Sequence, residues 1–246
     1  MFIAANWKMN LDKVSISKFC DDLYNYKFSS KVEACIFPSL PYMDYLNNLI
    51  KKLPISVGGQ NCHYKSHGAF TGEVSPKFLR DTGCEYVIIG HSERRSINNE
   101  SDNEIKLRAQ SAIDTNLKVI LCVGENLSHR EKGYALKFVE QQLLKCLPND
   151  FKNLLVAYEP VWSIGTGKIP NVSEINEMHD HIKKVVLKNT NKKVKVLYGG
   201  SVNVENIDSI LNVINVDGVL VGGASLKVKD FLAIYSAAVK HLNNSI

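Results

Sequence analysis

Eight short apolar runs recur along the 246-residue chain, and longer stretches with apolar residues at helical spacing lie between them. The runs cover residues 2–5, 34–37, 55–58, 86–89, 119–123, 154–158, 194–198 and 219–221. Continuous apolar strands of this kind are typical of a parallel sheet that is covered on both faces. Residues 105–113 illustrate the intervening pattern, with apolar residues three and four positions apart.

The alternation of strands and helices predicts an α/β fold built from βαβ units. Eight repeats favour a closed (β/α)8 barrel, an eight-stranded parallel sheet with outer helices, over an open doubly wound sheet. The absence of a GxGxxG motif before the first predicted helix supports the same choice. Because no linker rich in Pro, Ser or Gly divides the chain, residues 1–246 are predicted to form one domain.

Capping residues indicate where helices begin. Ser101 and Glu104 form a capping-box pattern, and Ser173 is predicted to cap the helix that comes after residues 160–168. A helical turn is also expected directly after His91.

Composition and charge narrow the class of function. Hydrophobic residues make up 45% of the chain and charged residues 22%, which is ordinary for a soluble globular protein. The net charge of +5 is spread as short lysine pairs, which argues against a nucleic-acid groove but suits a small anionic substrate. No apolar stretch approaches the roughly 20 residues of a membrane span, and no secretory signal is evident. We expect a cytoplasmic protein that binds neither nucleic acid nor membrane.

The six cysteines are expected to be free thiols in a reducing compartment, because they are scattered, form no CxxC pair and lie partly in apolar runs. No cysteine or histidine spacing predicts a metal site. His179 and His181 flank an aspartate, but positions two apart point away from each other on a helix. We therefore expect a solvated helix surface there.

In a (β/α)8 barrel the functional groups lie just after the strands, at one end of the barrel. Those positions carry Asn6-Trp7-Lys8, Gln60-Asn61, His91 to Arg95, Gly124-Glu125, Glu159, Gly199-Gly200-Ser201 and Gly222-Gly223. An amide, a cation, an imidazole, a carboxylate and several glycine-bearing turns are therefore predicted to converge on one site.

Glu159 is the strongest candidate for a catalytic base, because it comes after a buried run and the next residue is a proline that restricts its backbone. A base that removes a proton beside a carbonyl requires donors for the enediolate oxygens. Lys8 offers a charge, Asn6 an amide, and His91 a neutral imidazole, since a helix start disfavours imidazolium. Taken singly, each could be structural or solvated. Glu93, beside two arginines, is predicted to be an ion-paired structural group, although it could also contact the proton network.

A loop and two glycine turns complete the predicted site. Residues 160–168 contain two glycines and an apolar Val161-Trp162 pair, which suits a hinged lid. Gly199-Gly200-Ser201 is expected to precede Val202-Asn203 and a helix, and Gly222-Gly223 to precede Ala224-Ser225 and a short helical turn. Backbone N–H groups at such helix starts could bind phosphate. One glycine pair alone would be weak evidence. Two at these positions, together with Gly165 from the lid, predict a phosphate site.

Seven segments resemble triosephosphate isomerases, in order and from end to end of the chain. They are residues 6–10, 71–75, 89–95, 122–125, 158–168, 198–202 and 217–226. The resemblance implies a TIM barrel that interconverts dihydroxyacetone phosphate and D-glyceraldehyde 3-phosphate through an enediolate, in glycolysis and gluconeogenesis. It also implies a homodimer that uses no metal or organic cofactor.

The same resemblance assigns roles to residues. Glu159 would be the base and His91 the electrophile that shuttles protons, while Lys8 and Asn6 would contact the substrate and the enediolate. The implied phosphate cradle consists of Gly165, Ser201, Gly222 and Gly223. Thr71, in the glycine-flanked loop 67–73, would enter the partner subunit near its Asn6 and Lys8. Without the resemblance, this loop would be interpreted as a solvated hairpin.

The chain departs from the family pattern at several positions. Ser163 stands at a lid position where relatives usually have Ala, and its hydroxyl could add a hydrogen bond in one state of the lid. Lys183 and Asn215 stand where many relatives pair Arg with Asp, which removes a bidentate ion pair. Two rival functions stay open: another sugar-phosphate enzyme with a phosphate-binding barrel, and a non-catalytic barrel that binds phosphate or a surface partner.

Overall fold

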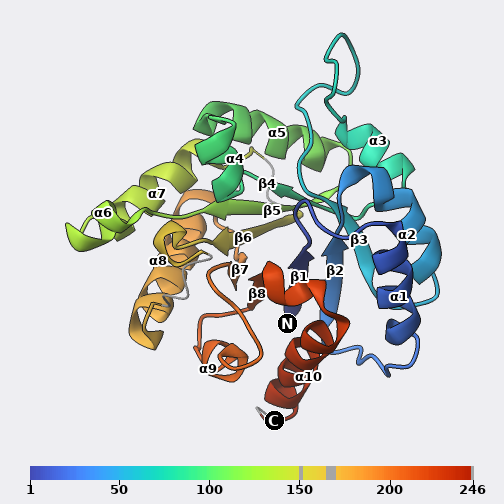
Figure 1. Cartoon of the computed structure of the whole chain (residues 1–246). Coiled ribbons are helices and arrows are strands. Elements are labelled where there is room, and N and C mark those ends of the chain that lie inside the picture. Colours follow the sequence, from blue (N-terminus) through green and yellow to red (C-terminus); the bar gives the residue numbers. More distant parts are fainter. Residues whose placement is uncertain (150–151, 165–169, 245–246) are drawn as a thin grey trace.

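The computed structural model describes residues 1–149, 152–164 and 170–244. Within these ranges, eight parallel strands close into a barrel in the order β1 to β8 (Figure 1). The strands are β1 Phe2–Asn6, β2 Glu33–Phe37, β3 Ser56–Gly59, β4 Tyr86–Ile89, β5 Lys118–Val123, β6 Leu154–Tyr158, β7 Lys195–Tyr198 and β8 Gly218–Val221. The predicted barrel is therefore confirmed, and each predicted strand lies within one residue of the observed one at either end.

Helices surround the barrel (Figure 1). The α-helices are α1 Lys13–Leu23, α2 Met43–Ile50, α3 Pro76–Asp81, α4 Ser92–Ile97, α5 Asp102–Asp114, α6 Leu127–Glu131, α7 Ala135–Cys146, α8 Val172–Thr190, α9 Ile207–Leu211 and α10 Val228–Asn244. Three short 3-10 turns are η1 Leu40–Tyr42, η2 Val161–Ser163 and η3 Gly223–Leu226. In the part of the chain that these ranges cover, no helix is both long and apolar enough to cross a membrane.

The apolar character of the strands results from burial on both faces. Phe2 and Ala4 of β1 belong to a buried cluster made only of strand residues, which must fill the barrel interior. The alternate residues Ile3 and Ala5 belong to a larger cluster that also contains the buried faces of the helices. Because neither face of a strand meets water, the sequence shows continuous apolar runs.

The helix caps are partly as predicted. Ser101 caps α5, and its capping box with Glu104 is present. The prediction that Ser173 caps α8 is wrong, because Asn171 is the cap and its side chain accepts a hydrogen bond from the Glu174 N–H at 2.9 Å. The helix thus begins at Val172, two residues after a proline that cannot donate a backbone hydrogen bond.

One side of α8 is buried where a solvated surface was expected. His179 is fully buried, and burial lowers its pKa to about 3. Its ring lies against the rings of Tyr158 and Tyr198, and Nδ1 lies 3.2 Å from the carbonyl oxygen of Asn215. The expectation fails for His179 because helix positions two apart need not share an environment. His181 instead lies 3.3 Å from a carboxylate oxygen of Glu140.

The two remaining structural expectations concern the cysteines and Lys183. All six cysteines are free and buried, as predicted. Lys183 forms no bidentate ion pair, as expected, but its Nζ makes a single contact, 2.8 Å from Oδ2 of Asp217. Asn215 donates its side-chain N–H to Asn176 instead. A single-contact ion pair therefore still links α8 to the start of β8.

Candidate active site

A cavity of about 460 Å³ opens at the carboxyl ends of the strands. The predicted site residues that line it are Asn6, Lys8, His91, Glu93, Glu159, Ser201, Gly222 and Gly223. Gly165 and the second half of the predicted lid lie outside the described residues. Thr71 is exposed in the segment between β3 and α3 and does not line this cavity. The barrel topology thus brings together residues that are up to 217 positions apart, from Asn6 to Gly223.

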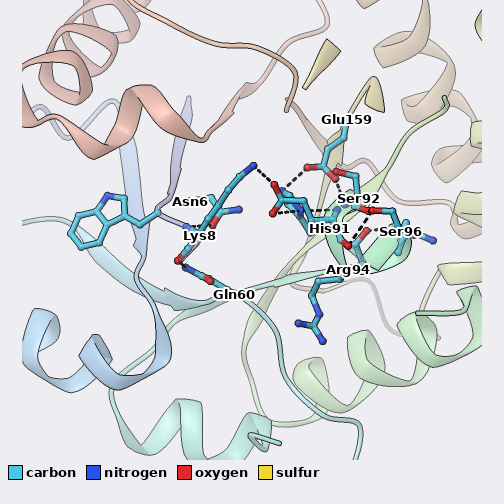
Figure 2. Close-up of polar contacts among 12 residues, drawn as sticks. Asn6, Lys8, Gln60, His91, Ser92, Arg94, Ser96 and Glu159 are labelled. Carbon is cyan, nitrogen blue, oxygen red and sulfur yellow. Dashed lines mark hydrogen bonds and ion pairs between the residues drawn. The ribbon is translucent and has the colours of Figure 1, made fainter. Parts of the chain in front are cut away.

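Glu159 directly succeeds β6 and is only 2% exposed. Its Oε2 accepts a hydrogen bond from the backbone N–H of Ser92 at 2.9 Å, and its Oε1 lies 3.0 Å from Nε2 of His91 (Figure 2). Two glycines leave space for Glu159. A side chain at position 124 would clash with it, because the Cβ would lie 1.6 Å from the Glu159 carbonyl oxygen. A Cβ on Gly199 would lie 3.0 Å from its Cγ. The carboxylate is therefore buried with both oxygens occupied.

His91 is the N-cap of α4, and its two ring nitrogens have different partners. Nδ1 accepts a hydrogen bond from the Glu93 N–H at 3.2 Å and so carries no proton. Nε2 faces the carboxylate of Glu159 and donates to it. This hydrogen-bond pattern assigns a neutral imidazole whose N–H points toward the cavity.

Lys8 adopts a left-handed backbone conformation with φ of 51°, which is uncommon for a residue with a side chain. Its neighbours hold it there: the carbonyl oxygen accepts hydrogen bonds from Ser39 Oγ at 2.9 Å and Gln60 Nε2 at 2.7 Å. Its N–H donates to Asn6 Oδ1 at 3.0 Å. Strained backbone at functional sites persists when several contacts fix it in this way. Gln60 therefore belongs to the site, although its position after β3 was the only sequence signal.

Glu93 contacts the other polar groups instead of its neighbouring arginines. Its carboxylate forms an ion pair with Lys8 Nζ and lies 3.8 Å from His91 Nδ1. The two arginines beside it in sequence bond instead to Glu100 and Asp102, each at 2.7 Å. Glu93 is therefore ion-paired, as predicted, but to Lys8 and not to an adjacent arginine, because successive helix positions point in different directions. Contact with the proton network is the alternative that the geometry favours.

The two glycine turns lead into different local structures. Gly222 leads directly into η3, as expected. After Gly199-Gly200-Ser201 and Val202-Asn203 the predicted helix is present as α9, although it begins only at Ile207. A Cβ on Gly222 would lie 3.9 Å from Lys8 Nζ, which places this turn beside the cation. Backbone N–H groups and a positive charge therefore meet on one side of the cavity.

Glu125 is a fully buried carboxylate whose role the sequence did not indicate. Its Oε1 accepts hydrogen bonds from Trp162 Nε1 at 2.9 Å and from Arg130 Nη2 at 2.8 Å. The Tyr158 hydroxyl donates to the same oxygen at 3.1 Å, and burial, followed by this carboxylate, raises the pKa of Tyr158. The sequence predicted for Trp162 only an apolar side chain in the lid. Its polar partner is 37 residues away, so no local pattern could reveal it.

The fold and the cavity define a (β/α)8-barrel enzyme with acid–base groups and glycine turns at the carboxyl ends of its strands. The model of the triosephosphate isomerase family matches residues 1–238. The triosephosphate isomerase of Francisella tularensis subsp. mediasiatica is 40% identical, over 97% of each chain. That of Hydrogenovibrio crunogenus is 41% identical, over 97% of this chain and 98% of its own. That of Zygosaccharomyces bailii is 41% identical, over 92% and 94% respectively. This chain belongs to the triosephosphate isomerase family.

Proposed function

We propose that this chain interconverts dihydroxyacetone phosphate and D-glyceraldehyde 3-phosphate, with Glu159 as the base. The observation that carries the proposal is the meeting of a buried carboxylate, a neutral imidazole donor and a lysine around one cavity. Family membership supports the same reaction. A barrel that only bound phosphate would have no need for a buried base beside a proton donor.

Glu159 would remove the proton from the carbon next to the substrate carbonyl and return it to the neighbouring carbon. The electron pair of the broken C–H bond forms the enediolate, whose negative charge develops on the former carbonyl oxygen. His91 would donate its Nε2–H to that oxygen and, after protonating it, would recover a proton from the adjacent hydroxyl. In the present geometry both Glu159 oxygens accept hydrogen bonds. At least one of these bonds must therefore be exchanged when the base turns to the substrate.

Lys8 would stabilise the developing negative charge, and Asn6 would assist it. An ammonium group that is partly shielded from bulk water interacts more strongly with an oxyanion than it would in solution. The ion pair with Glu93 keeps Lys8 Nζ at the cavity in the absence of substrate. Asn6 is buried and fixes the Lys8 backbone through its Oδ1. Positioning of the cation, in addition to direct contact with the substrate, is therefore part of the proposed role of Asn6.

The phosphate group would bind to backbone N–H groups of Ser201, Gly222 and Gly223, which line the cavity together with the acid–base groups. Residues 160–168 would close over it and exclude water, which limits loss of phosphate from the enediolate. Residues 160–164 of that segment, which include η2, lie within the described residues.

We further propose one catalytic domain, a cytoplasmic location and a homodimer. The support for a dimer is the loop that carries Thr71, in which Phe70 exposes an aromatic ring that a partner could cover. No metal or organic cofactor takes part in the proposed chemistry.

A coupled assay tests the proposed function. Purified enzyme receives D-glyceraldehyde 3-phosphate, and glycerol-3-phosphate dehydrogenase converts the product while NADH absorbance falls. We expect rapid turnover by the wild type and almost none by Glu159→Gln, which keeps the shape of the side chain but cannot accept the proton. A folded wild-type protein without activity would refute the reaction and favour a different sugar phosphate or a binding role.

A further inference from the structure

Ser163 ends η2 and is completely buried against the turn that comes after β7. Its carbonyl oxygen accepts a hydrogen bond from Ser201 Oγ at 2.6 Å. Its own hydroxyl oxygen accepts a second hydrogen bond from the Ser201 backbone N–H at 3.4 Å. Any amino acid at position 163 could provide the carbonyl, whereas only a side chain with a polar acceptor can provide the second bond.

Packing holds the Ser163 hydroxyl at this place. A Cβ on Gly200 would lie 3.0 Å from Ser163 Oγ and 2.2 Å from Tyr198 Oη, so both oxygens press against the backbone of the turn. Burial raises the pKa of Tyr198 to about 12, and the adjacent Ser163 hydroxyl opposes that rise. The hydroxyl is thus enclosed between a neutral phenol and the glycine turn, with no exposure to solvent.

The Ser201 N–H has a single hydrogen, so it makes one strong hydrogen bond at a time. A phosphate oxygen carries negative charge, and charge-assisted hydrogen bonds are shorter and about twice as strong as neutral ones. The bond from Ser201 N–H to Ser163 Oγ is neutral and long. Phosphate would therefore displace the hydroxyl from this N–H, and the lost hydrogen bond would be subtracted from the affinity for phosphate.

We propose that the Ser163 hydroxyl is an intramolecular competitor for the phosphate site, which occupies the Ser201 N–H until a phosphorylated ligand replaces it. The proposal rests on the proposed function, in which this N–H binds the substrate phosphate. It makes Ser163 a positioning residue that weakens binding of substrate, product and free phosphate alike. The bond from Ser201 Oγ to the Ser163 carbonyl is unaffected, so the start of the lid stays attached to the turn.

The test measures inorganic phosphate binding to the intact enzyme by calorimetry, together with its inhibition constant against D-glyceraldehyde 3-phosphate. Ser163→Ala removes the competitor, and Ser163→Cys replaces it with a weak acceptor that fills the space. Ser236→Ala is the matched control, because this exposed serine on α10 also loses hydrogen bonds but lies away from the cavity. Cooperative thermal unfolding confirms that each variant is folded. If Ser163→Ala does not fold, Ser163→Cys provides the phosphate-binding measurement.

We expect both Ser163 variants to bind phosphate about twofold to fivefold more tightly, in the lower part of the range that a net hydrogen bond provides. The inhibition constant should fall by the same factor, and Ser236→Ala should match the wild type. Unchanged or weaker phosphate binding by a folded Ser163 variant would overturn the proposal. A wild type that binds phosphate but does not isomerise the triose phosphate would instead refute the proposed function.

Discussion

Two buried glutamates lie just past neighbouring strands of the barrel, Glu125 after β5 and Glu159 after β6, yet their surroundings differ. Glu125 has a permanent cation, because Arg130 bonds to it through two guanidinium nitrogens. Glu159 has no lysine or arginine partner within the described residues, and it accepts hydrogen bonds from a backbone N–H and an imidazole. It also lines the cavity, whereas Glu125 does not. A position directly after a strand therefore does not make a glutamate a catalytic base. The hydrogen-bond partners of its carboxylate and its access to the cavity distinguish Glu159 from Glu125.

The largest expected effect is at Glu159. Glu159→Asp withdraws the carboxylate by about one methylene, and a displacement of this size at a reacting centre costs about a hundredfold or more in rate. We expect kcat to fall by at least that factor while KM changes little, because phosphate binding is untouched. Steady-state kinetics with both triose phosphates measure this. Near-wild-type turnover would refute the assignment of the base.

The second effect tests whether the active site around Glu159 functions in a single chain or requires the partner subunit. Thr71→Arg puts a long charged side chain on the exposed loop that we propose to enter the partner subunit. We expect a largely monomeric, nearly inactive protein in sedimentation and activity measurements. A suitable control is Ser66→Arg, at another exposed position of the same segment. A fully active Thr71→Arg monomer would show that neither the dimer nor this loop is required.

The third effect concerns Glu125. Glu125→Gln leaves Arg130 without its anion and weakens the bond to the indole of Trp162, while the base stays in place. Hydrogen bonds to charged groups contribute about 1.5–3 kcal/mol, so we expect a loss of stability in this range and a melting temperature several degrees lower. The activity should fall far less than in Glu159→Asp. A hundredfold loss of kcat with unchanged stability would remove the distinction between the two glutamates.

The fourth effect, which is absent at neutral pH, is the pH dependence of stability that His179 contributes. Burial lowers its pKa to about 3 in the folded protein, compared with the ordinary value of 6.5 for an unfolded chain. The unfolded state therefore binds a proton that the folded state refuses, so this contribution is fully present above pH 6.5 and is lost as the pH falls toward 3. Denaturant titrations at several pH values should show that the free energy of unfolding falls less steeply with decreasing pH in His179→Gln than in the wild type. The difference in slope should be up to about 1.4 kcal/mol per pH unit. The exposed His67→Gln is the control, and equal slopes for both variants would contradict the account.

The strands and the positions at their carboxyl ends could be predicted because burial on both faces produces continuous apolar runs. Glu159, His91 and Lys8 were predicted as a group for the same reason, since the topology alone brings strand ends together. The partners of individual side chains were not predictable. Lys8 rather than an arginine pairs with Glu93, and a carboxylate 37 residues away bonds to Trp162.

The cap of α8 and the burial of His179 illustrate a second limit. Asn171 and Ser173 are both good capping residues, and only the path of the chain into the helix decides between them. The environment of His179 depends on two tyrosines from different strands, which no helical pattern can specify.

The central claim, that Glu159 moves the proton, is tested most directly by the reaction in deuterium oxide. The product formed by the wild type should contain deuterium at the carbon that receives the proton, because the base exchanges its proton with solvent. Glu125→Gln should also incorporate deuterium, whereas Glu159→Gln should neither form product nor exchange the substrate C–H. Deuterium incorporation by Glu159→Gln at a rate near that of the wild type would contradict the account.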